Sequence, residues 1–364
     1  MSNPSSDPTG ANPYAAWLGR NGTRRFNMSS KVGWDAFVNA AAREPLPVLS
    51  RAQMAGLGEE ELEDYNEART VAHANPAAVR TSQVTSAFAL IDQVMASNRR
   101  DGDRLRGSVV VDAAPALGKT TIATRYAHQF HRRVYRRSGA TTQDGHQRLP
   151  VAFVPLTGNT TLKGLNRQIL SFYGHPAATR ATTTDLAAIA VDCVMTCETE
   201  LIVIDDLHFI DFDHKDGKQV SNHLKGLANA MPTTFMFTGV RLAERRFFSE
   251  GLLGPDAEYA QTARRATRCP VAPFTITTAP GFRAWVELLT ALEGQLLLAD
   301  ATPGTLTQHA RELHRRTQGH IGSLTTLLEH ACQVAIATGT EDITRDVLTQ
   351  AATDNAAENV SATG

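Results

Sequence analysis

The stretch SVVVDAAPALGKTT, residues 108–121, constrains the fold of this chain more than any other. A run of β-branched residues ends in a turn of small residues, and the helical pattern IATRYAHQF follows at once. A strand, a small-residue loop and a helix in this order make a P-loop, in which backbone N–H groups at the helix N-terminus bind phosphates. The predicted phosphate-binding residues are Ala114, Pro115, Ala116, Leu117, Gly118, Lys119, Thr120 and Thr121.

Two side chains of this loop have specific predicted roles. Lys119 reaches the terminal phosphates of ATP, and the Thr120 hydroxyl ligates Mg²⁺. The motif departs from the usual pattern at Ala113, where glycine normally stands. Alanine makes the same turn if its φ angle is negative, so the departure weakens the motif without cancelling it. The alternative, a Gly-Lys-Thr that merely caps a helix, fits the flanking strand and helix less well.

A second motif, ELIVIDDLHFID at residues 200–211, has the pattern of a central parallel strand that ends in two acids. Asp205 is predicted to hold Mg²⁺ through water, and Asp206 to polarise the attacking water as a catalytic residue together with Lys119. Asp206 stands where glutamate is more usual. Because aspartate is one methylene shorter, the sequence predicts an ATPase that hydrolyses ATP slowly or only in an assembly.

Further candidates lie around these motifs. The strand TTFMFTGV at residues 233–240 carries Thr238, which is predicted to sense the γ-phosphate or the water beside Asp206. Arg264 and Arg265 precede the next predicted strand; they either reach the nucleotide of a neighbouring subunit and stabilise transition-state charge, or are surface charge. A helix before the P-loop strand commonly covers the nucleotide base, so Val79 and its neighbours at 80–81 are base-pocket candidates.

The order of elements predicts the fold class. Strands expected at 108–112, 151–156, 201–205, 233–239 and 271–276 alternate with helices, which predicts an α/β fold with a parallel five-stranded sheet flanked by helices. The acidic strand and the four helices expected beyond Gly281 predict a P-loop AAA+ domain with a C-terminal helical lid. The predicted divisions are a flexible N-terminal arm at 1–30, an N-terminal helical segment at 31–98, the P-loop domain at 99–278, the lid at 279–352 and a disordered tail at 353–364.

Two local features stay open at this stage. Tyr14, Trp17 and Leu18 are isolated apolar residues in the predicted arm, and they form either a partner-binding peptide or a loose contact with the body of the protein. The sequence HRRVYRRS at residues 131–138 ends the helix after the P-loop with a basic cluster. That cluster is either a solvated helix end, where cations favour the helix dipole, or a patch that binds nucleic acid.

Composition limits the partners of the chain. Among 364 residues the net charge is −1, so the whole molecule is not an electrostatic binder of nucleic acid, and any DNA contact must come from a local patch or an assembly. No apolar run approaches the length of a membrane span, and the N-terminus lacks the regions of a signal peptide. The sequence therefore predicts a cytoplasmic protein with no membrane partner.

Several segments resemble the TniB/TnsC-type transposition ATPases, which lie close to the origin-recognition branch of AAA+. They are APALGKTTIATRY, PLTGNTTLKGLNRQILSFYG, IVIDDLHFI, TTFMFTGV, QTARR and TQGHIGSLTTLLEHACQVAIATGTEDIT, and the resemblance covers about residues 75–350. Ala113 and Asp206 depart from the family pattern. The departures bear more on the rate of hydrolysis than on nucleotide binding.

The resemblance implies an ATP-dependent assembly of the chain with itself, as a ring or filament on duplex DNA, that recruits or activates a transposase and selects the target site. The implied cofactors are ATP and Mg²⁺. Lys163 and the loop with Lys215 and Lys218 are candidates to face DNA. A near-neutral chain is compatible with this function, because a filament repeats a small patch many times.

Two alternatives remain. One is a signalling ATPase of the STAND type, a nucleotide switch in regulation or phage defence; such proteins often carry a double aspartate at the acidic strand. They usually add a winged-helix module and a sensor region after the lid, and this sequence stops after the lid, which counts against the reading. The other alternative is a degenerate P-loop in a structural adaptor.

Overall fold

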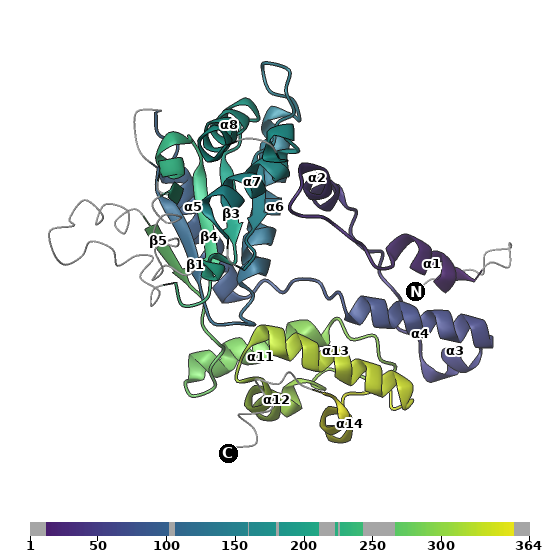
Figure 1. Ribbon diagram of the computed structural model, residues 1–364. Helices are drawn as coiled ribbons and strands as arrows, with labels where there is room; N and C mark the ends of the chain where they lie inside the picture. Colours follow the sequence, from purple (N-terminus) through teal and green to yellow (C-terminus); the bar gives the residue numbers. More distant parts are fainter. Residues whose placement is uncertain are drawn as a thin grey trace. The chain divides into compact units, whose positions relative to one another are not determined.

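The computed structural model describes residues 12–101, 106–158, 160–179, 182–210, 223–224, 226–242 and 266–352 (Figure 1). The chain divides into two compact units, and the division does not follow the sequence order. One unit, here called the α/β unit, holds described residues from 26–40 and 82–272. The other, here called the helical unit, holds described residues from 12–25, 41–81 and 273–352.

The α/β unit is built on a five-stranded parallel sheet with strand order β2-β3-β4-β1-β5. The strands are β1 (Ser108–Asp112), β2 (Val151–Pro155), β3 (Leu201–Asp205), β4 (Thr234–Gly239) and β5 (Ala266–Pro270). Residues of β3 and β4 are buried throughout, as their continuous apolar sequences predict for central parallel strands. The predicted AAA+ sheet is confirmed.

The fifth strand lies before the position that the sequence predicted. It runs over Ala266–Pro270 instead of 271–276, and it pairs with β1 from Ser108↔Ala266 to Asp112↔Pro270. The prediction was wrong because it followed the apolar residues of VAPFTI, whereas an edge strand such as β5 exposes most of its side chains. Phe274, taken for a strand residue, is buried in the core of the helical unit.

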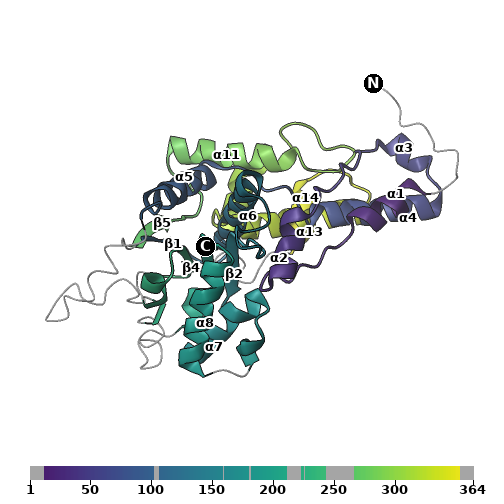
Figure 2. The ribbon, with the colours of Figure 1, turned by 90° about the horizontal axis from the view of Figure 1, so that it is seen from above.

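Helices cover both faces of the sheet. Right-handed crossovers place the connection from β1 to β2 on one face, and the connections that return from β2 through β3 and β4 on the other. Figure 2 shows this arrangement, with α5 and α6 on one side of the strands and α7 and α8 on the other. The bounds are α5 (Ser82–Ser97), α6 (Lys119–Ser138), α7 (Leu162–Tyr173) and α8 (Thr183–Thr196), with short 3-10 turns at Pro176–Thr179 and Leu207–Phe209.

Helix α2 (Lys31–Asn39) belongs to the α/β unit although it lies far before the P-loop in the sequence. Its anchor is Trp34, which is fully buried, stacks on Phe153 of β2 at a centroid distance of 5.8 Å and donates from Nε1 to Nδ1 of His131 on α6. Burial lowers the pKa of His131 to about 4, so its imidazole is neutral and can accept this bond at neutral pH. Helix α2 is therefore fixed to α6 and the sheet.

The helical unit combines the C-terminal helices with segments from the N-terminal part of the chain. Its helices are α1 (Pro13–Asn21), α3 (Arg51–Ala55), α4 (Glu59–His73), α11 (Ala279–Glu293), α12 (Ala310–Thr317), α13 (Ile321–Ala337) and α14 (Arg345–Gln350), with a 3-10 turn at Thr307–His309. The predicted N-terminal helical segment at 31–98 is thus shared between the two units. In the described part of the chain, no helix has both the length and the apolar character that crossing a membrane requires.

The structure differs from the predicted flexible arm over residues 1–30. Pro13–Asn21 form helix α1, whose N-cap Asn12 accepts from the N–H groups of Tyr14 and Ala15. Trp17 is buried in a small apolar cluster and donates from Nε1 to the carbonyl of Glu44. The Pro, Ser and Gly content of this region suggested disorder, but packing on α4 supplies the burial that the local sequence lacks. The first eleven residues lie outside the described part.

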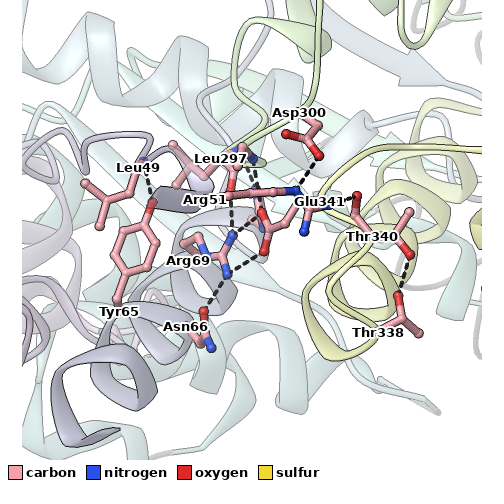
Figure 3. A network of polar contacts seen from close by, with 12 residues as sticks. Leu49, Arg51, Tyr65, Asn66, Arg69, Leu297, Asp300, Thr338, Thr340 and Glu341 are labelled. Atoms are coloured by element: carbon pink, nitrogen blue, oxygen red, sulfur yellow. Dashed lines mark hydrogen bonds and ion pairs between the residues drawn. The ribbon is translucent and has the colours of Figure 1, made fainter. Parts of the chain in front are cut away.

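A buried ion pair fastens α4 to the C-terminal helices of the same unit. The Arg69 guanidinium donates to both carboxylate oxygens of Glu341 at 2.7 and 3.0 Å, and both side chains are at most 5% exposed (Figure 3). Arg69 also donates to the Leu297 carbonyl and Asn66, while Glu341 accepts from the Ala299 N–H. Both oxygens of Glu341 and both terminal nitrogens of Arg69 therefore have hydrogen bonds, as a buried pair requires, while Nε of Arg69 has none. An exposed pair, Arg51 with Asp300, lies close by.

We expect Arg69→Ala to destabilise the protein by about 3–5 kcal/mol, because it leaves the buried Glu341 carboxylate without its cation. The matched control is Arg51→Ala, which removes an ion pair that is about half exposed and should cost less than about 1 kcal/mol. Urea denaturation measures both changes. The double variant Arg69→Met/Glu341→Gln should recover part of the loss. Equal costs for Arg69→Ala and Arg51→Ala would contradict the assignment.

Candidate nucleotide site

The candidate site lies where β1, β3 and β4 end at the same edge of the sheet. Strand β4 lies between the other two, and Val111 of β1 pairs with Thr238 of β4. The P-loop follows β1, and the two acids follow β3. Because parallel strands present their carboxyl ends on one side, this strand order brings the loop, the acids and Thr238 together, as the sequence predicted.

The P-loop lysine lies within the loop. Lys119 is the first residue of α6, its side chain is largely buried, and its Nζ donates to the Ala114 carbonyl at 2.8 Å. Burial lowers its pKa, and the nearby carboxylates of Asp206, Asp205 and Asp112 oppose this shift. The first N–H groups of α6 have no partner within the helix, so they and the ammonium group can bind phosphate oxygens.

Two alanines of the loop, Ala113 and Ala116, have different backbone conformations. Ala113 is buried and does not have a positive φ, so the condition that the sequence analysis set for alanine at this position is met. Ala116 takes the left-handed conformation with φ 58°, as Gly118 does with φ 81°. A residue with a Cβ in this region costs about 1–2 kcal/mol. The strain in this loop therefore lies at Ala116.

The predicted metal ligands are in direct contact. Thr120 donates from Oγ1 to Oδ1 of Asp205 at 3.3 Å. Asp205 is 3% exposed, and burial raises its pKa; the neighbouring Asp206 charge adds to the shift, while hydrogen bonds from Thr238 and Thr120 oppose it. A hydroxyl and a carboxylate at a phosphate site are the oxygen donors that Mg²⁺ prefers. These two residues fit a magnesium ion that also contacts phosphate.

Thr238 is engaged with both acids. Its hydroxyl donates to Oδ1 of Asp205 and accepts from the backbone N–H of Asp206 at 3.2 Å, and the residue is fully buried. The single hydroxyl proton is therefore directed at a carboxylate. The prediction placed Thr238 beside the Asp206 strand, where it lies; in this structure its contacts are with the acids.

Asp206 has an unusual backbone for a residue with a side chain. Its φ is 59° and its ψ 41°, in the left-handed region, and the 3-10 turn Leu207–Phe209 follows directly. Its side chain is 38% exposed, and one of its oxygens lies 3.7 Å from Nδ1 of His208. Strained backbone of this kind costs about 1–3 kcal/mol and is often found at functional sites.

The sequence analysis missed Asp112, the last residue of β1. This carboxylate is buried beside the P-loop, accepts from the Leu242 N–H at 2.9 Å and lies 3.3 Å from the Arg268 guanidinium of β5. It also contributes to the negative field on Lys119. The available signal was an acid that ends an apolar strand directly before the phosphate-binding turn.

Other predicted residues are placed as follows. Thr121 lies in the first turn of α6, Leu117 is buried, and Pro115 is exposed on the loop. Val79 belongs to the helical unit and packs against its apolar core.

Arg264 and Arg265 lie outside the described residues, directly before β5. Lys163 is exposed at the start of α7, and Lys215 and Lys218 lie outside the described residues.

Comparisons with known proteins agree with this geometry. Residues 102–247 match the AAA domain family, and no curated protein sequence matches the chain. The structure of the Aeropyrum pernix Orc1 protein in complex with DNA is 14% identical, with a TM-score of 0.55 over 80% of this chain and 68% of that chain.

Two further structures are more distant. Cdc6p from Pyrobaculum aerophilum is 13% identical, with a TM-score of 0.48 over 74% of this chain and 66% of that one. Drosophila ORC bound to AT-rich DNA and Cdc6 is 10% identical, with a TM-score of 0.44 over 82% of this chain and 46% of that one. The family match and the Orc1 likeness agree with the sheet order and the P-loop: the chain contains an AAA domain with the P-loop AAA+ fold.

Proposed function

We propose that the α/β unit binds ATP with Mg²⁺ and hydrolyses it slowly. The observation that carries the proposal is the convergence of Lys119, Thr120 and Asp205 at one edge of the sheet. Lys119 binds the terminal phosphates, while Thr120 and Asp205 hold Mg²⁺, which neutralises phosphate charge when bound. Burial partly desolvates both Lys119 and Asp205, and a phosphate–metal pair would supply each with a counter-charge.

Within this proposal Asp206 polarises the attacking water and Thr238 positions the two acids. The Asp206 side chain is partly exposed, so its carboxylate is open to water. Its N–H is held by Thr238, which fixes the backbone from which the carboxylate extends. The shorter reach of aspartate compared with glutamate makes slow turnover the expected behaviour. ATP then acts mainly as a switch between bound and free states.

We propose further that the ATP-bound chain assembles with itself on duplex DNA and recruits or activates a transposase. The support is the sequence resemblance to the TniB/TnsC-type ATPases and the fold shared with Orc1, a protein whose structure was determined with DNA. Arg264 or Arg265 is proposed to reach the nucleotide of the next subunit, and Val79 to contact the base. Lys163 is exposed and remains a proposed DNA contact, with Lys215 and Lys218.

The decisive experiment is electron microscopy and light scattering of the protein with duplex DNA and a slowly hydrolysed ATP analogue. We expect ATP-dependent assemblies larger than a dimer, with DNA binding that weakens as salt rises. Lys119→Ala is the control and should abolish assembly. An ATP-loaded protein that stays monomeric and ignores DNA at low salt would contradict the proposal. Unchanged nucleotide binding and assembly in Lys119→Ala would instead indicate a structural adaptor.

The second candidate function is a STAND-like signalling switch in regulation or phage defence. The observation that favours it is the double aspartate at the end of β3, Asp205-Asp206. The same light-scattering experiment separates the two functions, because a STAND-like switch assembles without DNA when a protein or phage ligand is present.

We expect Asp205→Asn to remove most of the stabilisation that Mg²⁺·ATP confers, which is about 2.7 kcal/mol at a ligand concentration of 100 Kd. Burial raises the pKa of Asp205 above its value in the unfolded chain. The free energy of unfolding of the protein without nucleotide therefore falls as pH rises from the unfolded to the folded pKa of Asp205. At neutral pH the ligand-free variant should therefore melt no lower than the wild type. Thermal unfolding with and without Mg²⁺ tests both points. The control is Asp192→Asn, which changes an exposed acid on α8. If Mg²⁺·ATP stabilises Asp205→Asn as much as the wild type, Asp205 does not hold Mg²⁺.

We expect Asp206→Glu to leave nucleotide affinity unchanged and to raise ATP turnover by about tenfold, because the longer side chain reaches further towards the attacking water. This is a part of the roughly 10²–10⁴-fold that a well-positioned general base contributes. Asp206→Asn should retain binding and lose turnover. Nucleotide affinity by fluorescence and phosphate release by a coupled assay give the two readouts. If all three proteins turn over ATP at one rate, Asp206 is not the residue that acts on water.

A further inference from the structure

The charged residues of helix α6 are all positive. Its 20 residues, KTTIATRYAHQFHRRVYRRS, contain one lysine, five arginines and no acidic residue. The chain as a whole is nearly neutral, with a net charge of −1. A helix face that only meets solvent normally mixes both signs, because opposite charges three or four residues apart stabilise the helix and like charges destabilise it. Exposure to solvent alone therefore does not explain the composition of α6.

Three of the arginines form a line along the helix. Arg125, Arg132 and Arg136 are spaced by seven and four residues, which places them on one side of an α-helix. All three are exposed, and the buried residues Ala123, Ala127 and Val134 lie on the opposite side of α6. We call these three residues the arginine stripe.

The neighbouring arginine, Arg133, is in a different situation. It is paired with Asp92 of α5 at 3.1 Å, and its guanidinium lies over the ring of Phe130. Within the described residues, no ion pair engages the arginine stripe. Asp92 therefore forms an ion pair with one arginine of α6 but not with the stripe, and the nearest acid of α2, Asp35, acts on Tyr135.

The stripe creates a positive local field. Arg132 and Arg125 both lower the pKa of His128, which lies between them, in addition to the larger effect of burial. The helix dipole accounts only for the basic residues of the last turn, Arg136 and Arg137. Arg125 and Arg132 lie before that turn, so a solvated helix end does not explain them.

We propose that the arginine stripe contacts the phosphate backbone of duplex DNA. The inference rests on the proposed assembly on DNA and assigns it a surface. Eleven residues of α-helix separate Arg125 from Arg136, about 16 Å, which corresponds to about five base pairs of backbone. Guanidinium groups match phosphate oxygens in geometry and charge. Since the stripe offers charge without a shaped pocket, binding is independent of sequence, and an assembly repeats it along the DNA.

The test compares two variants of the same helix. The triple variant Arg125→Gln/Arg132→Gln/Arg136→Gln removes the stripe, and Arg133→Gln removes the compensated arginine as the matched control. Fluorescence anisotropy with a random-sequence duplex and a slowly hydrolysed ATP analogue measures affinity over a range of salt concentrations. Each phosphate contact contributes about 0.9 to the slope of log K against log salt, so the triple variant should lose about 2.7 of it. The control should keep its slope, and both variants should keep nucleotide affinity and melting temperature.

The outcomes separate this inference from the proposed function. A wild-type protein that binds no DNA overturns both. A wild-type protein that binds DNA, with a triple variant that binds with the same affinity and slope, overturns the stripe alone. Loss of binding to poly-glutamate in the triple variant with DNA binding intact also overturns it, and identifies an acidic protein segment as the occupant. A reduced salt slope in the triple variant, but not in Arg133→Gln, supports the proposal.

Discussion

The hydrogen bonds that join Thr238, Asp205 and Thr120 connect three strands of the sheet through one carboxylate. Thr238 belongs to β4, Asp205 to β3, and Thr120 to the helix that follows β1. This contact exists only because β4 lies between β1 and β3, so that the P-loop and the acidic strand approach from both sides of one threonine. The strand order therefore creates the site: a sheet with β1 next to β3 would have no place for Thr238 between phosphate loop and acid.

The sequence predicted the parts of this site that depend on local pattern. Strands β1, β3 and β4 are apolar runs buried on both faces, and such runs have few alternative folds. The fifth strand was misplaced because an edge strand needs no apolar pattern, and its position is set by pairing with β1 instead. The structure places Lys119, Thr120, Asp205, Asp206 and Thr238 together as the motifs predicted. Asp112 was missed because a strand-end acid has no distinctive spacing of its own.

Features that depend on distant parts of the chain could not be read from the sequence. Arg69 and Glu341 are 272 positions apart, and neither residue has a neighbour in sequence that identifies its partner. Helix α1 was expected to be an arm for the same reason: Trp17 is isolated in the sequence, and its burial comes from α4 and the segment around Glu44. The φ angle of Ala116 is a related case, since only the loop conformation shows that this alanine, and not Ala113, has a left-handed backbone.

The two compact units are joined by more than one segment of the chain. The chain passes between the units near residues 25, 40, 81 and 272, so four backbone connections join them, where a C-terminal lid alone would need one. Helix α2 is fixed to the α/β unit through Trp34, while the segments on both sides of it belong to the helical unit. Helix α4 is in turn fixed to the C-terminal helices by Arg69 and Glu341. The N-terminal helices α1, α3 and α4 therefore share one compact unit with the C-terminal helices, although the α/β unit separates them in the sequence.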